Sequence, residues 1–379
     1  MGLLSALRRS IIADLDSRLA PQFHDLFDAD PVTIYDVGAA GGAITPYPDG
    51  PSNWAPVVGF EPHPVSHRQL IDAGLPDHVS LHNLALADHD GPVTFYSGQG
   101  KQRTKSSLRP IDYTGSVNEE VTIDALALDS VPERLGIPAA NFIKLDTEGT
   151  EDQIMKGGEQ MFADEILGVQ TEIAFWTGQS GGVSFSQIDS VLTAQGFVLF
   201  DLQINRSDIR VIGGRKDKVR SGDALYLRNF DQLWSAEGDQ AVLRTKLLKL
   251  MSLAIAWRYL NYAFELADFG REHALLDRTE FDAIVTPLIR TSDLSDRIPN
   301  IPGRMGLALF FDSLSYAFYP SMKKGVPYAF NSLGNHWVVR KEKNRPSSVF
   351  LHCPVLKNGT VNQAKTIQLN DYHDSPDKP

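Results

Sequence analysis

The sequence has little cysteine: Cys353 is the single cysteine in 379 residues. This excludes an intrachain disulfide, a secreted disulfide framework and a zinc site made of several thiolates. Such a chain is typical of a reducing compartment, and we expect a cytoplasmic protein. Positive charge is also in deficit, because 36 lysines and arginines oppose 47 aspartates and glutamates, which gives a net charge of -11. This balance disfavours a broad phosphate-binding surface, so we expect no nucleic-acid partner.

Long uninterrupted apolar runs are missing too. Lys249 and Arg258 interrupt the apolar stretch 247–264, whereas a membrane-spanning helix needs about 20 consecutive apolar residues. Residues 1–27 have the pattern of an amphipathic helix, in which two arginines break the apolar core that a secretory signal peptide requires. We therefore expect no transmembrane segment. The amphipathic helix is expected to dock on its own domain, with a membrane surface as the alternative.

What is present is the composition of an ordinary globular protein, with 42% hydrophobic and 22% charged residues. From residue 32 onward, short β-branched runs alternate with helical patterns, which predicts an α/β fold whose parallel sheet has helices on both faces. Strands are expected at residues 32–38, 56–61, 79–86, 141–146, 167–175 and 197–203, with residues 224–229 as a late antiparallel strand.

Two stretches depart from this alternation. Residues 92–96 and 121–123 predict an inserted hairpin instead of a helix. After about residue 230 the pattern changes to long helices, which are expected at residues 240–267 and 279–288. These changes divide the chain into an N-terminal amphipathic helix (1–30), an α/β domain (31–232) and a mainly helical C-terminal extension with an irregular tail (233–379).

A turn of small residues follows the first expected strand, since residues 34–42 read Ile-Tyr-Asp-Val-Gly-Ala-Ala-Gly-Gly. Such a turn lets a ligand approach the backbone closely. The second expected strand ends in Glu61, whose carboxylate can accept hydrogen bonds from both hydroxyls of a ribose. The two features together predict a nucleoside pocket that suits an adenosyl ligand or a dinucleotide, although a small-residue turn alone can be purely structural.

Five short sequence blocks follow one another in this part of the chain. They are residues 36–39, 61–62, 83–86, 128–129 and, most specific, 143–151 with Lys-x-Asp-x-Glu-Gly-x-Glu. In their order the sequence resembles the FkbM family of S-adenosylmethionine-dependent methyltransferases over residues 32–176. The resemblance implies a Rossmann-like class I methyltransferase sheet, mostly parallel with an antiparallel last strand. It also implies methyl transfer to a hydroxyl of a glycan, nucleotide-sugar or natural-product acceptor.

The resemblance also assigns cofactor contacts to particular residues. The turn after the first strand would line the methionine end of S-adenosylmethionine, Glu61 would bind its ribose, and Asn83 with Ala85 would lie near its adenine. Asn83 has the alternative of capping its own turn. The implied cofactor-binding residues are Asp36, Gly38, Ala39, Gly41, Gly42, Glu61, Asn83 and Ala85.

Two departures from the family pattern affect this turn. Ala40 stands where the family usually has asparagine, which removes a hydrogen-bonding side chain. Four prolines between residues 46 and 56 predict a loop in place of a long first crossover helix, because a proline inside a helix costs about 3 kcal/mol. Gly41, Gly42 and nearby backbone N–H groups would then hold the methionine carboxylate.

Three carboxylates are expected on the acceptor side, because ligands of open α/β sheets bind at the carboxyl ends of the strands. We interpret Asp146 as the first candidate for a general base, Glu148 as the second and Glu172 as an assisting group. Alternatively, Asp146 and Glu148 bind a divalent cation such as magnesium, which prefers oxygen ligands.

Nearby charged residues have structural alternatives. Glu148 and Glu151 can be acids in the first turn of a helix that begins near Gly149, and for Glu151 this is the favoured reading. Lys144 lies inside an expected strand, where it is either a catalytic group or a buried partner for one of the carboxylates.

Two basic loops stand out against the acidic average. They suggest an acceptor with an anionic group, such as a phosphate or a sugar carboxylate, although solvated loop charges are the simpler interpretation. The loops contain Lys101, Arg103, Lys105 and Arg109, and Arg206, Arg210, Arg215, Lys216, Lys218 and Arg220.

Other prominent side chains are expected to be structural. We expect His63 and His67 to be capping or surface residues, and the aromatic series in residues 257–264 to be helix packing. Two other functions compete with a methyltransferase: an NAD-dependent oxidoreductase that uses Glu61, and a non-catalytic adenosyl-binding protein with a degenerate site.

Overall fold

The computed structural model describes residues 21–39, 55–98, 105–110, 119–175, 182–206, 219–236, 238–257 and 259–290, and residues 302–304, 306, 307 and 310. Several predictions lie outside these ranges. They concern the helix over residues 1–20, the turn residues Ala40, Gly41 and Gly42, the prolines at 46, 48 and 51, Lys101 and Arg103 of the first basic loop, residues 207–218 of the second, and the C-terminal tail.

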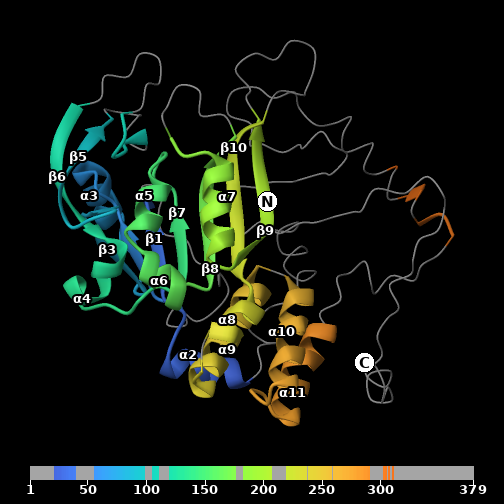
Figure 1. The fold of residues 1–379 in the computed structure, drawn as a ribbon. Helices are drawn as coiled ribbons and strands as arrows, with labels where there is room; N and C mark the ends of the chain where they lie inside the picture. Colours follow the sequence, from blue (N-terminus) through green and yellow to red (C-terminus); the bar gives the residue numbers. More distant parts are fainter. Residues whose placement is uncertain are drawn as a thin grey trace.

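Seven strands form the central sheet in the order β3-β2-β1-β7-β8-β10-β9 (Figure 1). Each strand from β3 to β8 in this order runs parallel to its neighbour, and β10 lies antiparallel between β8 and β9. The predicted Rossmann-like sheet, mostly parallel with a late antiparallel strand, is therefore confirmed. The strands are β1 (Ile34–Val37), β2 (Val57–Phe60), β3 (Val79–His82), β7 (Phe142–Leu145), β8 (Gly168–Ala174), β9 (Phe197–Arg206) and β10 (Val219–Arg228).

The prediction of a single strand over residues 79–86 is wrong. β3 ends at His82, and the chain continues as β4 (Ala85–Ala87) in a second sheet of order β4-β6-β5. The break lies at Asn83, whose side-chain Nδ2 donates to the carbonyl oxygens of Glu61 (2.8 Å) and Pro62 (2.9 Å). In the second sheet, β5 (Gly91–Ser97) and β6 (Glu119–Ala127) pair antiparallel, which confirms the predicted hairpin.

Helices cover one face of the central sheet along its length. Side chains of alternate strand residues, such as Tyr35, Val37, Ile143 and Leu145, point to this face and form one buried cluster with it. The helices that contribute to the cluster are α4 (Val131–Leu135), α5 (Glu151–Lys156), α6 (Glu159–Asp164) and α7 (Phe185–Ala194), while α3 (Pro64–Asp72) follows β2.

The opposite face is apolar only where the parallel strands begin. There Ile34, Phe142 and Leu227 share one buried cluster with the N-terminal and C-terminal helices, which gather at one end of the sheet, below it in Figure 1. Towards the carboxyl ends of the strands, the same face carries Asp36 and Lys144 instead. The helices at this end are α2 (Pro21–Ala29), α8 (Phe230–Ala236), α9 (Gln240–Ala256), α10 (Leu260–Glu272) and α11 (Arg278–Arg290).

The helix expected at residues 240–267 is two helices, because α9 ends before Trp257. The Trp257 ring is buried and stacks on Phe142 of β7, with 4.6 Å between ring centroids. The rings of Tyr259 and Tyr262 pack against Phe200 of β9, with 5.1 and 4.7 Å between ring centroids. The aromatic series is therefore packing, as predicted.

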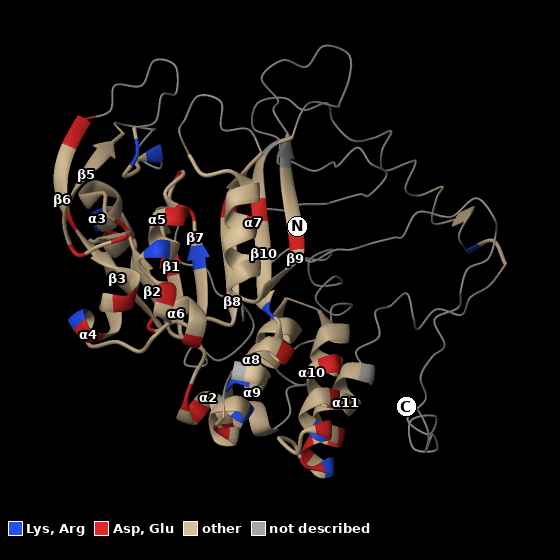
Figure 2. Cartoon of the chain, viewed as in Figure 1, with Lys and Arg blue, Asp and Glu red and all other residues tan. Residues whose placement is uncertain are grey.

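The C-terminal helices thus share a core with the sheet, and the domain boundary near residue 232 stays a prediction. Over the described elements, acidic and basic residues are interspersed in Figure 2. Within the same part of the chain, no helix is long and apolar enough to span a membrane.

Candidate active site

The strand order reverses direction at β1. From β1 the chain first adds β2 and then β3 on one side, and it later returns to add β7 on the other side. A ligand of an open α/β sheet binds at the carboxyl ends of the strands beside such a switch point. Gly38 follows β1 here with φ of 84°, and a Cβ atom on it would lie 1.9 Å from the carbonyl oxygen of Asp146. The chain segments leaving β1 and β7 therefore touch, and only glycine fits between them. The next residue, Ala39, is fully buried.

Glu61 lies at the neighbouring strand end. Gly38 N donates to the carbonyl oxygen of Phe60 at 3.0 Å, so the turn after β1 and the end of β2 are joined directly. The Glu61 side chain is buried, and its Oε1 accepts a hydrogen bond from His63 N at 2.7 Å. Burial raises the pKa of Glu61 to about 7, and Asp36 adds to this rise, while the His63 hydrogen bond and Lys144 oppose it.

The two histidines after Glu61 have structural contacts. The Nδ1 atom of His63 accepts from Val65 N (3.2 Å) and Ser66 N (3.4 Å) and so caps α3, which confirms the predicted capping role. The Nε2 atom of His67 lies 3.4 Å from the carbonyl oxygen of Leu81.

The two residues assigned to the adenine side, Asn83 and Ala85, make contacts within the protein. The amide of Asn83 holds the backbone of residues 61 and 62 instead of capping its own turn, and Ala85 is buried in the second sheet. Their contact with adenine stays a prediction.

Lys144 joins two acids across the switch point. Its Nζ lies 3.0 Å from Asp36 Oδ1 and 3.5 Å from Asp146 Oδ2, which confirms the interpretation of Lys144 as a carboxylate partner. Burial alone would lower the pKa of Lys144, but Asp36, Asp146 and Asp223 raise it overall. Asp36 is fully buried, whereas 42% of the Asp146 side chain is exposed. Asp36 thus holds Lys144, and Lys144 in turn binds an accessible carboxylate at the sheet edge.

Glu172 and Asp223 add two carboxyl groups beside Asp146. They lie opposite each other on β8 and β10. Burial raises the pKa of Glu172 to about 9, with further contributions from Asp146, Glu148, Glu151 and Asp223. Glu172 is therefore protonated at neutral pH and is a hydrogen-bond donor.

Asp223 itself was missing from the predicted site. Burial, with help from Asp146, raises its pKa to about 6, against an opposing effect of Lys144. It was missed because the late strand was expected to begin only at residue 224, whereas β10 begins at Val219. An acid inside an apolar strand was the signal that could have identified it.

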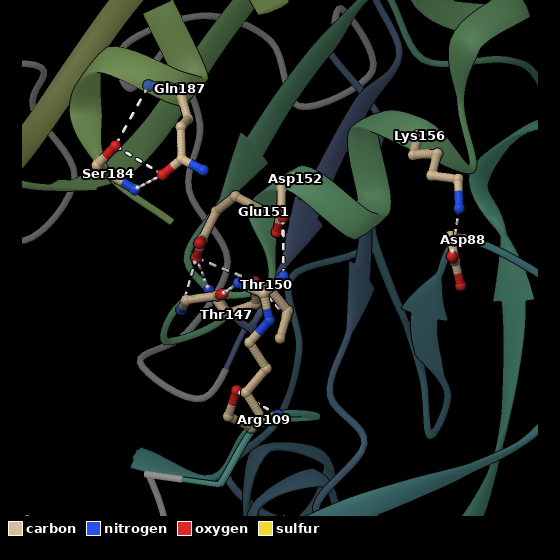
Figure 3. Close-up of polar contacts among 11 residues, drawn as sticks. Asp88, Arg109, Thr147, Thr150, Glu151, Asp152, Lys156, Ser184 and Gln187 are labelled. Atoms are coloured by element: carbon tan, nitrogen blue, oxygen red, sulfur yellow. Dashed lines mark hydrogen bonds and ion pairs between the residues drawn. The ribbon is translucent and has the colours of Figure 1, made fainter. Parts of the chain in front are cut away.

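The turn that follows β7 has a strained conformation. Glu148 has φ of 57°, which costs a non-glycine residue about 1–2 kcal/mol, and Gly149 has φ of 100°. The turn is held from inside by Glu151, whose Oε1 accepts from Thr147 N (3.0 Å), Thr147 Oγ1 (3.0 Å) and Gly149 N (3.2 Å), as Figure 3 shows. Glu151 lies in the first turn of α5, as predicted, and its buried carboxylate also organises the turn before the helix.

A segment from the second sheet holds the same turn from outside. Ser107 Oγ donates to the carbonyl oxygen of Glu148 (3.1 Å), and Arg109 Nη1 donates to that of Gly149 (2.8 Å). Arg109 Nη2 also pairs with Asp152 Oδ2 at 2.8 Å. Arg109 therefore binds the turn itself, which neither interpretation of the first basic loop predicted.

A metal centre finds no support in this geometry. Within the described ranges, no group of three or more histidine, cysteine, aspartate or glutamate side chains is arranged to hold a metal ion. The predicted alternative of a divalent cation at Asp146 and Glu148 is therefore unsupported there.

Comparison with known proteins gives a family match and several distant structural similarities. The family model described as "Methyltransferase FkbM domain" matches residues 36–199. No curated protein matches the chain significantly. A solved methyltransferase FkbM from Methylobacillus flagellatus is 17% identical, with a TM-score of 0.28, over 52% of this chain and 44% of its own. The chain thus spans less than half the length of that protein.

Two other solved structures are similar over most of their length. The magnesium protoporphyrin IX methyltransferase of Synechocystis, with bound SAM, is 8% identical with a TM-score of 0.31 over 60% of this chain and 92% of its own. The precorrin-6y C5,15-methyltransferase of Geobacter metallireducens is 10% identical with a TM-score of 0.28 over 55% and 87%.

Proposed function

We propose that this chain, whose residues 36–199 are a methyltransferase FkbM domain, transfers the methyl group of S-adenosylmethionine to a hydroxyl oxygen. The observation that carries the proposal is the contact between the Gly38 turn and the strand end at Glu61, beside the backbone carbonyl of Asp146. The acceptor class is a glycan, a nucleotide sugar or a natural product. The basic residues of the two loops, apart from Arg109, which binds the turn after β7, are the candidates for binding an anionic group on it.

The residues at the switch point fit the adenosyl cofactor. Gly38 has no side chain, so the backbone leaving β1 can lie against the Asp146 carbonyl, and the turn after β1 is held beside the strand end at Glu61. Glu61 offers a buried carboxyl group, oriented by His63 N, to the ribose hydroxyls. When bound, S-adenosylmethionine supplies a methyl group on a sulfonium sulfur, and the S–C bond breaks as the new O–C bond forms.

The carboxylates beside this site divide the remaining work. Asp146 is partly exposed and bound by Lys144, and we assign it the role of orienting the acceptor hydroxyl and accepting its proton. Glu148 is the second candidate for this role. Glu172 is protonated at neutral pH, so its role is to donate a hydrogen bond to the acceptor and not to act as a base.

Calorimetric titration with S-adenosylmethionine and S-adenosylhomocysteine tests this function. We expect both to bind the wild-type protein, Glu61→Gln to weaken the affinity at least about tenfold, and NAD not to compete. Glu133→Gln, which changes an exposed glutamate of α4, is the matched control and is expected to bind like the wild type. Absence of binding to the folded wild-type protein would overturn the proposal.

A further inference from the structure

We propose that Ser107 and Arg109 are positioning residues, which hold the strained turn after β7 and thereby fix the backbone that carries Glu148 at the carboxyl edge of the sheet. The inference rests on the proposed function, since it concerns how one of the proposed catalytic carboxylates is placed. It assigns a role to residues 105–110, a segment of the second sheet's long connection between β5 and β6.

The segment is fixed to its own sheet before it reaches the turn. Ser107 pairs with Tyr96 of β5 through two backbone hydrogen bonds of 2.8 and 3.3 Å. Ser106 Oγ accepts from Gly98 N at 2.9 Å, and Ser107 is buried. The side chains of Ser107 and Arg109 are therefore presented from a fixed support.

The contacts fix the two peptide groups that define the strained turn. The carbonyl oxygen of Glu148 is held by Ser107 and that of Gly149 by Arg109, while Glu151 accepts the N–H of Gly149 on the other side. A left-handed residue such as Glu148 persists only where surrounding contacts oppose its relaxation. Arg109 also pairs with Asp152, at the start of α5, so a single guanidinium joins the turn and the helix (Figure 3).

Neither residue belongs to the proposed catalytic group. Ser107 reaches the turn through a backbone carbonyl, and Arg109 binds a carbonyl and a carboxylate of the protein. Their effect on chemistry passes through Glu148. Loss of Arg109 is thus expected to move the Glu148 carboxylate away from Glu172.

The pKa of Glu172 can be measured by NMR titration of protein labelled with carbon-13 glutamate. This measurement distinguishes a positioning role of Arg109 from a direct effect of its positive charge on Glu172. In the full-length Arg109→Met variant, displacement of the Glu148 charge would lower the pKa of Glu172 by about half a unit or more. Removal of a positive charge without displacement would raise it. The Glu172 signal is identified by its loss in Glu172→Gln. A pKa in Arg109→Met equal to or above the wild-type value would overturn the proposal.

Two further variants make the result specific. Arg134→Met removes another guanidinium that pairs with an acid, Asp90 at 3.5 Å, and is expected to leave the Glu172 titration unchanged. Arg109→Lys keeps the charge and is expected to recover part of the shift. If circular dichroism shows that Arg109→Met does not fold, Ser107→Ala replaces it, with a smaller shift in the same direction expected and an unchanged titration overturning the proposal.

Titration with S-adenosylhomocysteine separates this inference from the proposed function. We expect Arg109→Met to bind it within about twofold of the wild type, because the Glu61 site is intact. If the wild type does not bind, the methyltransferase proposal fails whatever the Glu172 titration shows. If binding is normal in both proteins and the Glu172 titration does not fall, only the positioning role fails.

Discussion

Glu172 of β8 lies directly opposite Asp223 of β10, so two carboxyl groups share one cross-strand position near the carboxyl edge of the sheet. Burial raises the pKa of Glu172 to about 9 and that of Asp223 to about 6, and the charge of Asp146 adds to both rises. A proton stays on Glu172 at neutral pH, and the pair therefore offers one donor and one acceptor to the site.

The Glu172→Gln variant is expected to gain stability over the wild type as the pH rises. The folded-state pKa of Glu172 is raised from 4.5 to about 9, so its contribution is fully present below about pH 4.5 and is lost as pH rises towards 9. Glutamine resembles the protonated acid and cannot ionise, so the variant keeps this contribution to stability at high pH. The difference in unfolding free energy should grow with a limiting slope of about 1.4 kcal/mol per pH unit.

Urea unfolding of both proteins between about pH 5 and pH 9 measures this difference. Glu165→Gln, which changes an exposed glutamate, is the control and should run parallel to the wild type. Parallel curves for Glu172→Gln and the wild type would show that Glu172 is already ionised in the folded protein.

Affinity for S-adenosylhomocysteine is expected to rise with pH through about 7. Ribose hydroxyls donate best to an ionised carboxylate, and the pKa of Glu61 is about 7. About one-tenth of the groups are ionised one unit below the pKa, so binding at pH 8 should be about tenfold tighter than at pH 6. Calorimetry measures it, and the dependence should vanish in Glu61→Gln while persisting in Glu133→Gln. A pH-independent affinity in the wild type would contradict a ribose contact that needs the carboxylate.

Substitution of two glycines separates backbone strain from steric contact. Gly38 and Gly74 have nearly equal φ values of 84° and 82°, but a Cβ atom at Gly74 meets nothing within 4 Å. We expect Gly74→Ala to cost about 1 kcal/mol and Gly38→Ala more than about 3 kcal/mol, because the latter forces the segments after β1 and β7 apart. Chemical unfolding gives both values. Equal losses would mean that the Asp146 carbonyl moves aside at little cost.

The α/β domain is not expected to fold without the C-terminal helices. A chain of residues 1–236 lacks α9–α11, which bury the apolar side chains of Ile34, Phe142 and Leu227 at one end of the sheet. We expect it to bind a hydrophobic dye and to lack a cooperative thermal transition, unlike the full chain. A cooperative transition would instead establish that the predicted boundary near residue 232 separates independent domains.

Local sequence patterns predicted most of the strands, because each of these strands is a short apolar run. The apolar run ending at Asp36-Val37 and the one ending at Glu61 were located to within two residues at either end. The break at Asn83 was missed because it depends on carbonyl groups of residues 61 and 62, which a local pattern does not include. The same limit explains the helix break at Trp257, where ring stacking on Phe142 overrides a continuous helical pattern.

The candidate site was predicted to different extents for a similar reason. Asp146 and Glu148 were predicted from their places after β7 and Glu172 from its place near the end of β8, and the charges of Asp146 and Glu148 help to raise the pKa of Glu172. The protonation of Glu172 depends on burial and on the nearby charge of Asp146, so it required the folded sheet. Arg109 looked like one member of a solvent-facing basic loop, because its partner Asp152 lies 43 residues away.

The two sets of contacts at the turn after β7 also imply an order of folding. The Glu151 contacts close only two to four residues, whereas Arg109 reaches Asp152 across 43 residues, and longer closures cost more entropy. The turn can thus form before the second sheet docks. Arg109→Met is then expected to speed unfolding with little change in the refolding rate, and Glu151→Gln to slow refolding, in stopped-flow experiments. The short motif after β7 would act as a folding nucleus as well as a part of the site.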